Sequence, residues 1–198
     1  MSESVGVFLD RDGTLNVEGD YIRTPEELQI LEGAAKAVRK LNEHGIITCV
    51  ISNQSGIARG FLTEADLIPI HAKLREELLR EGAKLGGIYY CPHHPTAGIA
   101  PYNVECECRK PKPGMLQQGA RELNIALQRS FVVGDSVVDM QAGNAVDAAT
   151  ILVQTGYGRK SLQTCNEQNI PISFVADSIV EAVDFILDNV KGDRIHND

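Results

Sequence analysis

The sequence has no apolar run that approaches the length of a membrane span. Its start, Met1-Ser2-Glu3-Ser4, lacks the basic and apolar regions of a signal peptide, so we expect a cytoplasmic protein with no membrane partner. Positive charge is also scarce, because 19 Lys and Arg stand against 27 Asp and Glu, a formal net charge of −8. Nucleic acids require a basic face and are not expected as partners. An anionic substrate would need a locally positive pocket.

Disulfide bonding and a second domain also lack support in the sequence. Five cysteines in a cytosolic chain predict free thiols or metal ligands rather than a disulfide framework. The 198 residues suffice for one domain with a full core. They contain no internal repeat, low-complexity segment or convincing linker. We expect a single domain over residues 1–198 and a monomer.

Apolar runs that predict strands alternate with apolar residues at helical spacing. The expected strands cover residues 5–10, 46–51, 87–90, 130–133, 149–153 and 174–176. The expected helices cover residues 33–44, 63–80, 113–123, 138–145 and 178–189. Pro69 is expected to kink the second helix or to shift its start. This alternation predicts an α/β fold with a mostly parallel sheet and right-handed crossovers.

The most informative segment is Asp10-Arg11-Asp12-Gly13-Thr14, which follows the first expected strand. Ligands of open α/β sheets bind at the carboxyl ends of the strands. One carboxylate there can act as nucleophile while its neighbour moves protons. An ordinary turn is the alternative. A calcium loop is excluded, because its sixth position would be Leu15 rather than Gly and its twelfth Tyr21 rather than Glu.

A second apolar strand, residues 131–133, leads into Gly134-Asp135. If the two strands are parallel neighbours, Asp10, Asp12 and Asp135 converge at one edge of the sheet. Clustered carboxylates repel one another unless a hard cation binds between them, and Mg²⁺ suits a site of carboxylates, water and a phosphate oxygen. The alternative is that Gly134-Asp135 is only a turn that ends a strand.

Groups that suit a phosphoryl ligand occur twice more. Ser52-Asn53 ends the expected strand 46–51 with a hydroxyl and an amide that can bind phosphoryl oxygens without adding charge. Arg109-Lys110 opens a basic, proline-containing run just before a helix. Such a run is often only a solvated face, but a stiff backbone and a helix N-terminus favour an anion site.

In their order along the chain, these four segments resemble the motifs of the haloacid dehalogenase superfamily of phosphotransferases. The resemblance implies that Asp10 is the nucleophile that forms an aspartyl-phosphate. It implies that Asp12 protonates the leaving oxygen and later activates water. Ser52 and Lys110 would stabilise the transferring phosphoryl group, and Asp10, the Asp12 main-chain carbonyl and Asp135 would hold Mg²⁺.

Cysteine and histidine form a second cluster in the expected irregular segment 91–108. Cys91 and His93 make one ligand pair and Cys106 and Cys108 make another, which predicts a closed, structural Zn²⁺ site. His94 is the alternative to His93. Incidental thiols are the alternative to the whole site, because the one-residue gaps are tighter than those of common zinc fingers. Zinc would order this loop and fix the basic residues that follow Cys108.

Residues 5–158, this cluster included, resemble the D-glycero-D-manno-heptose 1,7-bisphosphate 7-phosphatases. Shared segments are Tyr89-Tyr90-Cys91-Pro92-His93-His94-Pro95 and Asn53-Gln54-Ser55-Gly56-Ile57-Ala58-Arg59-Gly60. The family implies a Rossmann-like three-layer sandwich with a minimal cap and a zinc-binding loop. Ser52 departs from the Thr often found there but keeps the hydroxyl. The implied substrate contacts are Glu18, Gly19, Asp20, Tyr21, Asn53, Gln54, Ser55, Arg59 and Arg109.

The resemblance implies a Mg²⁺-dependent phosphatase that removes the 7-phosphate of a small phosphosugar and leaves heptose 1-phosphate. Its product would feed lipopolysaccharide or another glycan, and the preferred anomer stays open. Histidinol-phosphate phosphatase is the nearest alternative, although Arg59 and Arg109 favour a substrate with a second phosphate. A phosphosugar-binding regulatory protein is the non-enzyme alternative, which the intact Asp10, Asp12 and Asp135 set disfavours.

Overall fold

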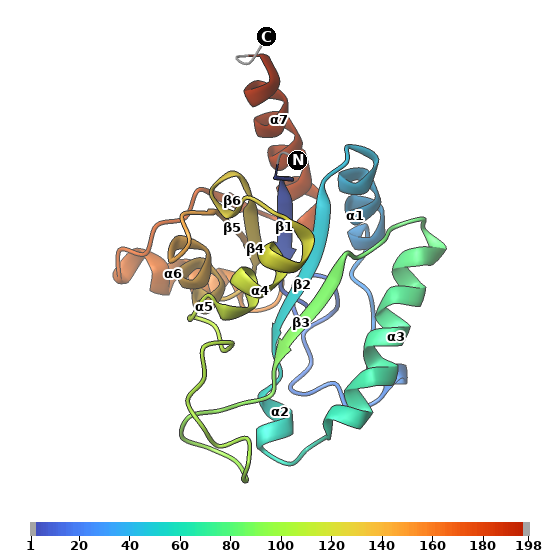
Figure 1. The fold of residues 1–198 in the computed structure, drawn as a ribbon, viewed down its shortest axis with the longest axis vertical. Helices are drawn as coiled ribbons and strands as arrows, with labels where there is room; N and C mark the ends of the chain where they lie inside the picture. Colours follow the sequence, from blue (N-terminus) through green and yellow to red (C-terminus); the bar gives the residue numbers. More distant parts are fainter. Residues whose placement is uncertain (1–2, 196–198) are drawn as a thin grey trace.

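The computed structural model describes residues 3–195, and only the backbone of residues 191–195. Six parallel strands form one sheet in the order β3-β2-β1-β4-β5-β6 (Figure 1). This confirms the predicted α/β class with a parallel sheet. The strands are β1 (Gly6–Leu9), β2 (Ile47–Asn53), β3 (Gly87–Cys91), β4 (Phe131–Gly134), β5 (Ala149–Val153) and β6 (Phe174–Ala176).

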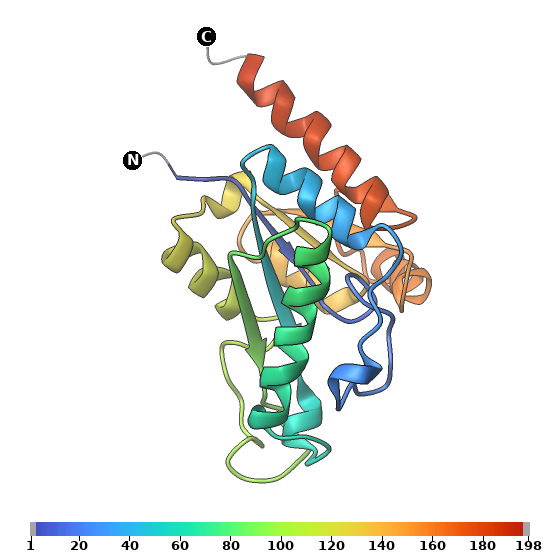
Figure 2. The same cartoon turned by 90° about the vertical axis from the view of Figure 1, so that its right-hand side faces the viewer.

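Helices cover both faces of the sheet, which explains why its central strands are continuously apolar. Along β1, Val7 and Leu9 pack on one face with the core beneath α1, α3 and α7, whereas Phe8 packs on the other with α4 and α5. Figure 2 shows α1 and α3 in front of the sheet and α7 beside α1. The helices are α1 (Ala34–Glu43), α2 (Ser55–Ala58), α3 (Glu64–Arg80), α4 (Gly114–Leu123), α5 (Val137–Asn144), α6 (Gly158–Glu167) and α7 (Ile179–Ile195), with short 3₁₀ turns η1 (Pro25–Glu27) and η2 (Leu127–Arg129).

Helix α3 begins where the sequence predicts and continues through its proline. Thr63 accepts a hydrogen bond from the Asp66 N–H, and the Asp66 carboxylate accepts one from the Thr63 N–H, a reciprocal capping box. Pro69 lies inside the helix, one turn beyond its first residues. It therefore leaves one carbonyl without its helical donor but does not end the helix.

Two helices were not expected from the sequence. Helix α2 is a single turn after β2, and α6 has only Gly158, Ser161 and Cys165 as buried residues. Residues 92–113 form a long loop between β3 and α4, which contains all of the predicted irregular segment 91–108 except Cys91, the last residue of β3. Its tip lies against α2, where the Ile99 N–H donates to the Ala58 carbonyl at 2.8 Å. Among the described residues, no helix is both long and apolar enough to cross a membrane.

Candidate active site and cysteine–histidine cluster

The three central strands bring the predicted motifs to one edge of the sheet. Because β1 lies between β2 and β4, Asp10 follows the central strand, with Ser52 on one side and Asp135 on the other. The Asp10 N–H donates to the Val133 carbonyl at 2.9 Å, which extends the parallel pairing one residue beyond β1. The side chains of Asp10, Ser52 and Asp135 are all buried.

Lys110 reaches the same point from the loop before α4. Its Nζ donates to Asp10 Oδ1 at 2.9 Å, to Asp139 Oδ1 at 2.5 Å and to the Ile51 carbonyl at 2.9 Å. Its main chain exchanges two hydrogen bonds with the Asn53 amide, at 3.0 and 3.1 Å. Burial lowers the pKa of Lys110, but the Asp10 and Asp139 carboxylates outweigh it and raise the pKa overall. The lysine is therefore a fixed positive charge beside Asp10.

Asp139 is a site residue to which the sequence assigned no role. One of its oxygens accepts from Lys110, and the other accepts from the N–H and the hydroxyl of Ser136 at 3.1 and 2.6 Å. Ser136 and Asp139 form the capping box of α5. Their spacing signals this cap, whereas the bond to Lys110 follows only from the tertiary fold.

Three carboxylates form a group with the chemistry of a magnesium site. Oxygens of Asp10, Asp135 and Asp139 lie within 4.8 Å of one another. Because both oxygens of Asp139 already accept hydrogen bonds, Asp10 and Asp135 are the better ligands. Burial is the largest cause that raises the pKa of Asp10 to about 8 and that of Asp135 to about 7. A hard divalent cation between these carboxylates would offset the free-energy cost of burying their negative charges. The all-oxygen donor set fits Mg²⁺.

The main chain around Asp135 is packed too closely to admit side chains. The Tyr157 N–H donates to Asp135 Oδ2 at 2.7 Å. A Cβ atom built on Gly13 or Gly156 would lie 2.1 Å from that same oxygen. Both glycines also have positive φ angles, 80° and 52°. The loop after β5 therefore closes over Asp135 only with glycine at these two positions.

Asp12 lies in a dense set of donors beside Asp10. The Arg11 guanidinium donates to both of its oxygens, through Nη2 at 2.9 and 2.8 Å and through Nε at 3.1 Å. Asn16 Nδ2 donates at 2.9 Å and Gln54 Nε2 at 3.0 Å. Gln54 Nε2 also lies 2.7 Å from the Ser52 hydroxyl, which links Asp12 to the end of β2.

A cavity of about 240 Å³ opens onto these groups. Its walls include all four predicted catalytic residues and seven of the predicted substrate contacts. Burial, followed by the charges of Asp12 and Asp10, raises the pKa of Glu18 in this wall to about 7. Arg59 and Arg109 do not line the cavity. The predicted catalytic and substrate-binding residues that line the cavity are Asp10, Asp12, Glu18, Gly19, Asp20, Tyr21, Ser52, Asn53, Gln54, Ser55 and Lys110.

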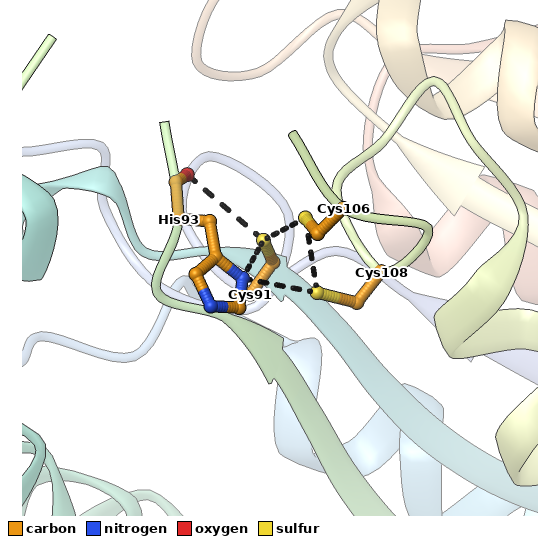
Figure 3. Close-up of side chains that lie close together, drawn as sticks. All are labelled: Cys91, His93, Cys106 and Cys108. Carbon is orange, nitrogen blue, oxygen red and sulfur yellow. Dashed lines mark hydrogen bonds between the residues drawn. The ribbon is translucent and has the colours of Figure 1, made fainter. Parts of the chain in front are cut away.

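The four predicted zinc ligands face one another where β3 ends, with Cys91 as its last residue and the other three in the loop that follows (Figure 3). Cys91 Sγ lies 3.5 Å from Cys106 Sγ and 3.7 Å from His93 Nδ1, and Cys108 Sγ lies 3.3 and 3.5 Å from the same two atoms. Ligand atoms of a tetrahedral Zn²⁺ site with bonds of about 2.3 Å lie about 3.8 Å apart. Three sulfurs and one imidazole nitrogen at this spacing fit zinc.

His94 is not part of this cluster. Its Nδ1 accepts hydrogen bonds from the N–H groups of Thr96 and Ala97, at 3.3 and 3.1 Å. His93 is therefore the histidine of the cluster. Arg109 Nη1 donates to the His93 carbonyl at 3.1 Å, so this arginine is attached to the loop rather than aimed at Asp10.

The chain is similar in sequence to a family model and to proteins of known name. The HAD-hydrolase-like family model matches residues 107–182, which include Lys110, Asp135 and Asp139. The D-glycero-beta-D-manno-heptose-1,7-bisphosphate 7-phosphatase of Yersinia pestis is 45% identical over 158 residues, 79% of this chain and 84% of that protein. The protein of the same name from Escherichia coli (strain K12) is 42% identical over 158 residues, with coverages of 79% and 83%.

A solved structure extends the similarity to the whole fold. The crystal structure of D,D-heptose 1,7-bisphosphate phosphatase from B. bronchiseptica, complexed with magnesium and phosphate, has a TM-score of 0.83 to this chain. The two are 34% identical, and the match covers 93% of this chain and 99% of that one. By sequence and by fold, the chain belongs to the family of the heptose-1,7-bisphosphate 7-phosphatases.

Proposed function

We propose that the chain is a Mg²⁺-dependent phosphatase that hydrolyses the 7-phosphate of D-glycero-β-D-manno-heptose 1,7-bisphosphate and leaves heptose 1-phosphate. One observation carries the proposal: Asp10, Lys110 and Asp135 converge on a cavity that Asp12 also lines. Phosphoryl transfer depends mainly on positioning and on neutralising the phosphoryl oxygens, and this arrangement supports both. We propose the β anomer as substrate because both relatives are named as phosphatases of that anomer.

In the first half of the reaction, an Asp10 oxygen attacks phosphorus and the bond from phosphorus to the sugar O7 breaks. Both donors to Asp10 among the described residues, Lys110 Nζ and the Arg11 N–H, bind Oδ1 and hold the carboxylate in place. Asp12 gives its proton to O7 as the sugar leaves. The products are the aspartyl-phosphate of Asp10 and heptose 1-phosphate.

In the second half, Asp12 takes a proton from water as the water oxygen attacks the same phosphorus. The bond between phosphorus and the Asp10 oxygen breaks, which releases inorganic phosphate and restores both carboxyl groups. Lys110 and the Ser52 hydroxyl bind phosphoryl oxygens in both halves. Bound by Asp10, the Asp12 carbonyl and Asp135, Mg²⁺ would supply positive charge to these oxygens.

We also propose that Cys91, His93, Cys106 and Cys108 bind one Zn²⁺ ion with a structural role. Four protein ligands leave no open coordination position, which argues against catalysis at this ion. Cys108 directly precedes Arg109 and Lys110. Zinc in the loop would therefore fix the start of the segment that delivers the Lys110 ammonium to Asp10.

The anomeric phosphate would bind near Arg59 and Arg109, because the cavity wall itself is acidic. Neither arginine lines the cavity in the present structure, so this assignment requires a substrate that reaches past the wall. The same acidic wall favours a second candidate. Glu18 and Asp20 suit the cationic amine of histidinol phosphate, whose phosphatases are the nearest alternative.

The decisive experiment compares phosphate release from both anomers of heptose 1,7-bisphosphate, histidinol phosphate and fructose bisphosphate. We expect the β-heptose bisphosphate to have the highest kcat/KM and its product to retain the 1-phosphate in a ³¹P spectrum. Preference for histidinol phosphate would replace the proposal with the second candidate, and a flat profile would contradict both.

Asp10→Asn serves as the matched control for this assay. Loss of the nucleophile is expected to lower kcat by about 10³-fold or more, with circular dichroism and zinc content unchanged. If the purified variant released phosphate at the wild-type rate, Asp10 would not be the nucleophile.

A further inference from the structure

Arg11 is a buried cation that the proposed mechanism does not use. Only 1% of its surface is exposed, although it lies between two residues of the candidate site. A guanidinium removed from water is costly unless its donors are paired. The partners of the Arg11 donors therefore indicate what the residue does.

The three nitrogens of the Arg11 guanidinium, Nε, Nη1 and Nη2, form a planar fork, and two of these three arms bind the Asp12 carboxylate. Nη2 and Nε together donate to both carboxylate oxygens, at 2.8 to 3.1 Å. Such a planar, charge-assisted contact fixes the direction of a carboxylate as well as its position. Arg11 therefore orients Asp12 together with the Asn16 and Gln54 amides, which also donate to this carboxylate.

The third arm of the fork points to helix α3. Among the described residues, Nη1 has one hydrogen-bond partner, the Nε2 atom of His71, at 3.5 Å. Burial, followed by the Arg11 charge, lowers the pKa of His71 to about 4. The ring is therefore neutral near pH 7 and can offer a lone pair to the guanidinium. Tyr90 packs edge-on against the ring with centroids 5.6 Å apart, which limits its rotation.

We propose that His71 is a positioning residue for proton transfer, because it fixes the Arg11 fork that in turn fixes the Asp12 carboxylate. The proposal rests on the function proposed above. His71 touches neither substrate nor metal in this scheme. Its effect is confined to the steps in which Asp12 gives or takes a proton, and this restriction separates it from a residue that only stabilises the fold.

The first test compares His71→Leu with His71→Gln. Leu fills similar space but offers no acceptor, whereas the Gln carbonyl reaches the place of Nε2. Misplacement of a catalytic group costs up to about 10²-fold. We expect Leu to lower kcat on the heptose bisphosphate by roughly tenfold with KM within about twofold of wild type, and Gln to restore most of the loss. A wild-type kcat for Leu, or a Gln variant as slow as Leu, would overturn the proposal.

The second test uses 4-nitrophenyl phosphate, whose leaving group needs no proton. Its first turnover requires no acid, while hydrolysis of the aspartyl-phosphate still requires Asp12 as base. In stopped flow, His71→Leu should keep the wild-type burst rate of 4-nitrophenolate release and slow the steady state that follows. Equal losses in both phases would indicate general damage to the site and overturn the proposal.

A replacement variant and a second substrate allow the role of His71 to be tested even if His71→Leu does not fold or the proposed sugar substrate is wrong. If His71→Leu does not fold, His71→Asn replaces it, because the shorter amide is polar but does not reach Nη1; it should behave as the slow variant. If the wild type hydrolyses 4-nitrophenyl phosphate but not the heptose bisphosphate, the proposed substrate is wrong. The burst assay would then still decide the role of His71.

Discussion

Among single residues, Asp139 shows where sequence reasoning ends. Its position three residues after Ser136 matches the spacing of a capping box, and the structure has that cap. Its second role, the bond to Lys110, joins groups 29 residues apart in the chain. No local pattern predicts such a contact. Asp10, Asp12 and Asp135, by contrast, follow apolar strands and were predictable because parallel strands end at one edge.

Asp139→Asn tests this second role. The variant keeps an acceptor for the cap but removes the negative charge opposite the Lys110 ammonium. Breaking a buried ion pair costs about 3–5 kcal/mol, so we expect a fall of that size in the unfolding free energy and a lower kcat. Asp66→Asn in α3 is the matched control, because it alters the same kind of cap without a lysine and should cost only about 1 kcal/mol. Equal losses in chemical denaturation would assign Asp139 to the cap alone.

The buried carboxylates make stability depend on pH and on magnesium. Asp10 and Asp135 have pKa values of about 8 and about 7, raised from 3.8 chiefly by burial. The folded protein therefore holds these protons more tightly than the unfolded chain does. It follows that their contribution to the unfolding free energy of the metal-free protein falls as the pH rises from about 4 to about 8.

Magnesium should reverse this loss where the carboxylates are charged. At about 100 times its Kd, a ligand adds about 2.7 kcal/mol, or about 5–10 °C in Tm for a chain of this size. We expect that shift at pH 8 and a smaller one at pH 5, because protons compete with the metal. Thermal denaturation with and without Mg²⁺ measures both, and Asp135→Asn should lose the shift. An equal shift at the two pH values would contradict the assignment.

Among helices and strands, the sequence predicts best those in which the buried positions follow a regular pattern of apolar residues. The strands β1 and β4 are buried at every residue, so their apolar runs are unambiguous. Helix α6 was missed because its buried face is made of Gly158, Ser161 and Cys165, which carry little apolar signal. Helix α2 is one turn long and depends on tertiary contacts, such as the bond from Ile99 to Ala58, rather than on periodicity.

The long loop after β3 has no regular structure to stabilise it, so its order should depend on metal. Cys106→Ser removes one ligand of the proposed zinc site. A cross-link that closes a loop of about 15 residues contributes about 3 kcal/mol, and we expect a loss of roughly that size. Elemental analysis should find one zinc per wild-type chain and little in the variant. Cys165→Ala, which changes a cysteine outside the cluster, should retain zinc. Wild-type protein without zinc, purified in the absence of chelators, would refute the site.

For the whole molecule, one chain supplies all four of the proposed catalytic residues that line the cavity. The residues that line the central cavity come from the end of β2, the first turns of α2 and α5, and the loops at the same edge of the sheet. The sequence anticipated this convergence on the condition that the strands before Asp10 and Asp135 are neighbours, because alternating strands and helices predict a parallel sheet but not its strand order. It did not anticipate that Arg59 and Arg109 lie outside the cavity lining, since the direction of loop side chains depends on packing that no spacing rule describes.

Because the proposed catalytic residues all belong to one chain, we expect an active monomer. A formal net charge of −8 adds repulsion between copies. We expect light scattering to give a mass near 21.6 kDa. Specific activity should stay constant on serial dilution, because dissociation of an obligate oligomer would lower it. A dimer mass together with activity that falls on dilution would show that the site requires a partner after all.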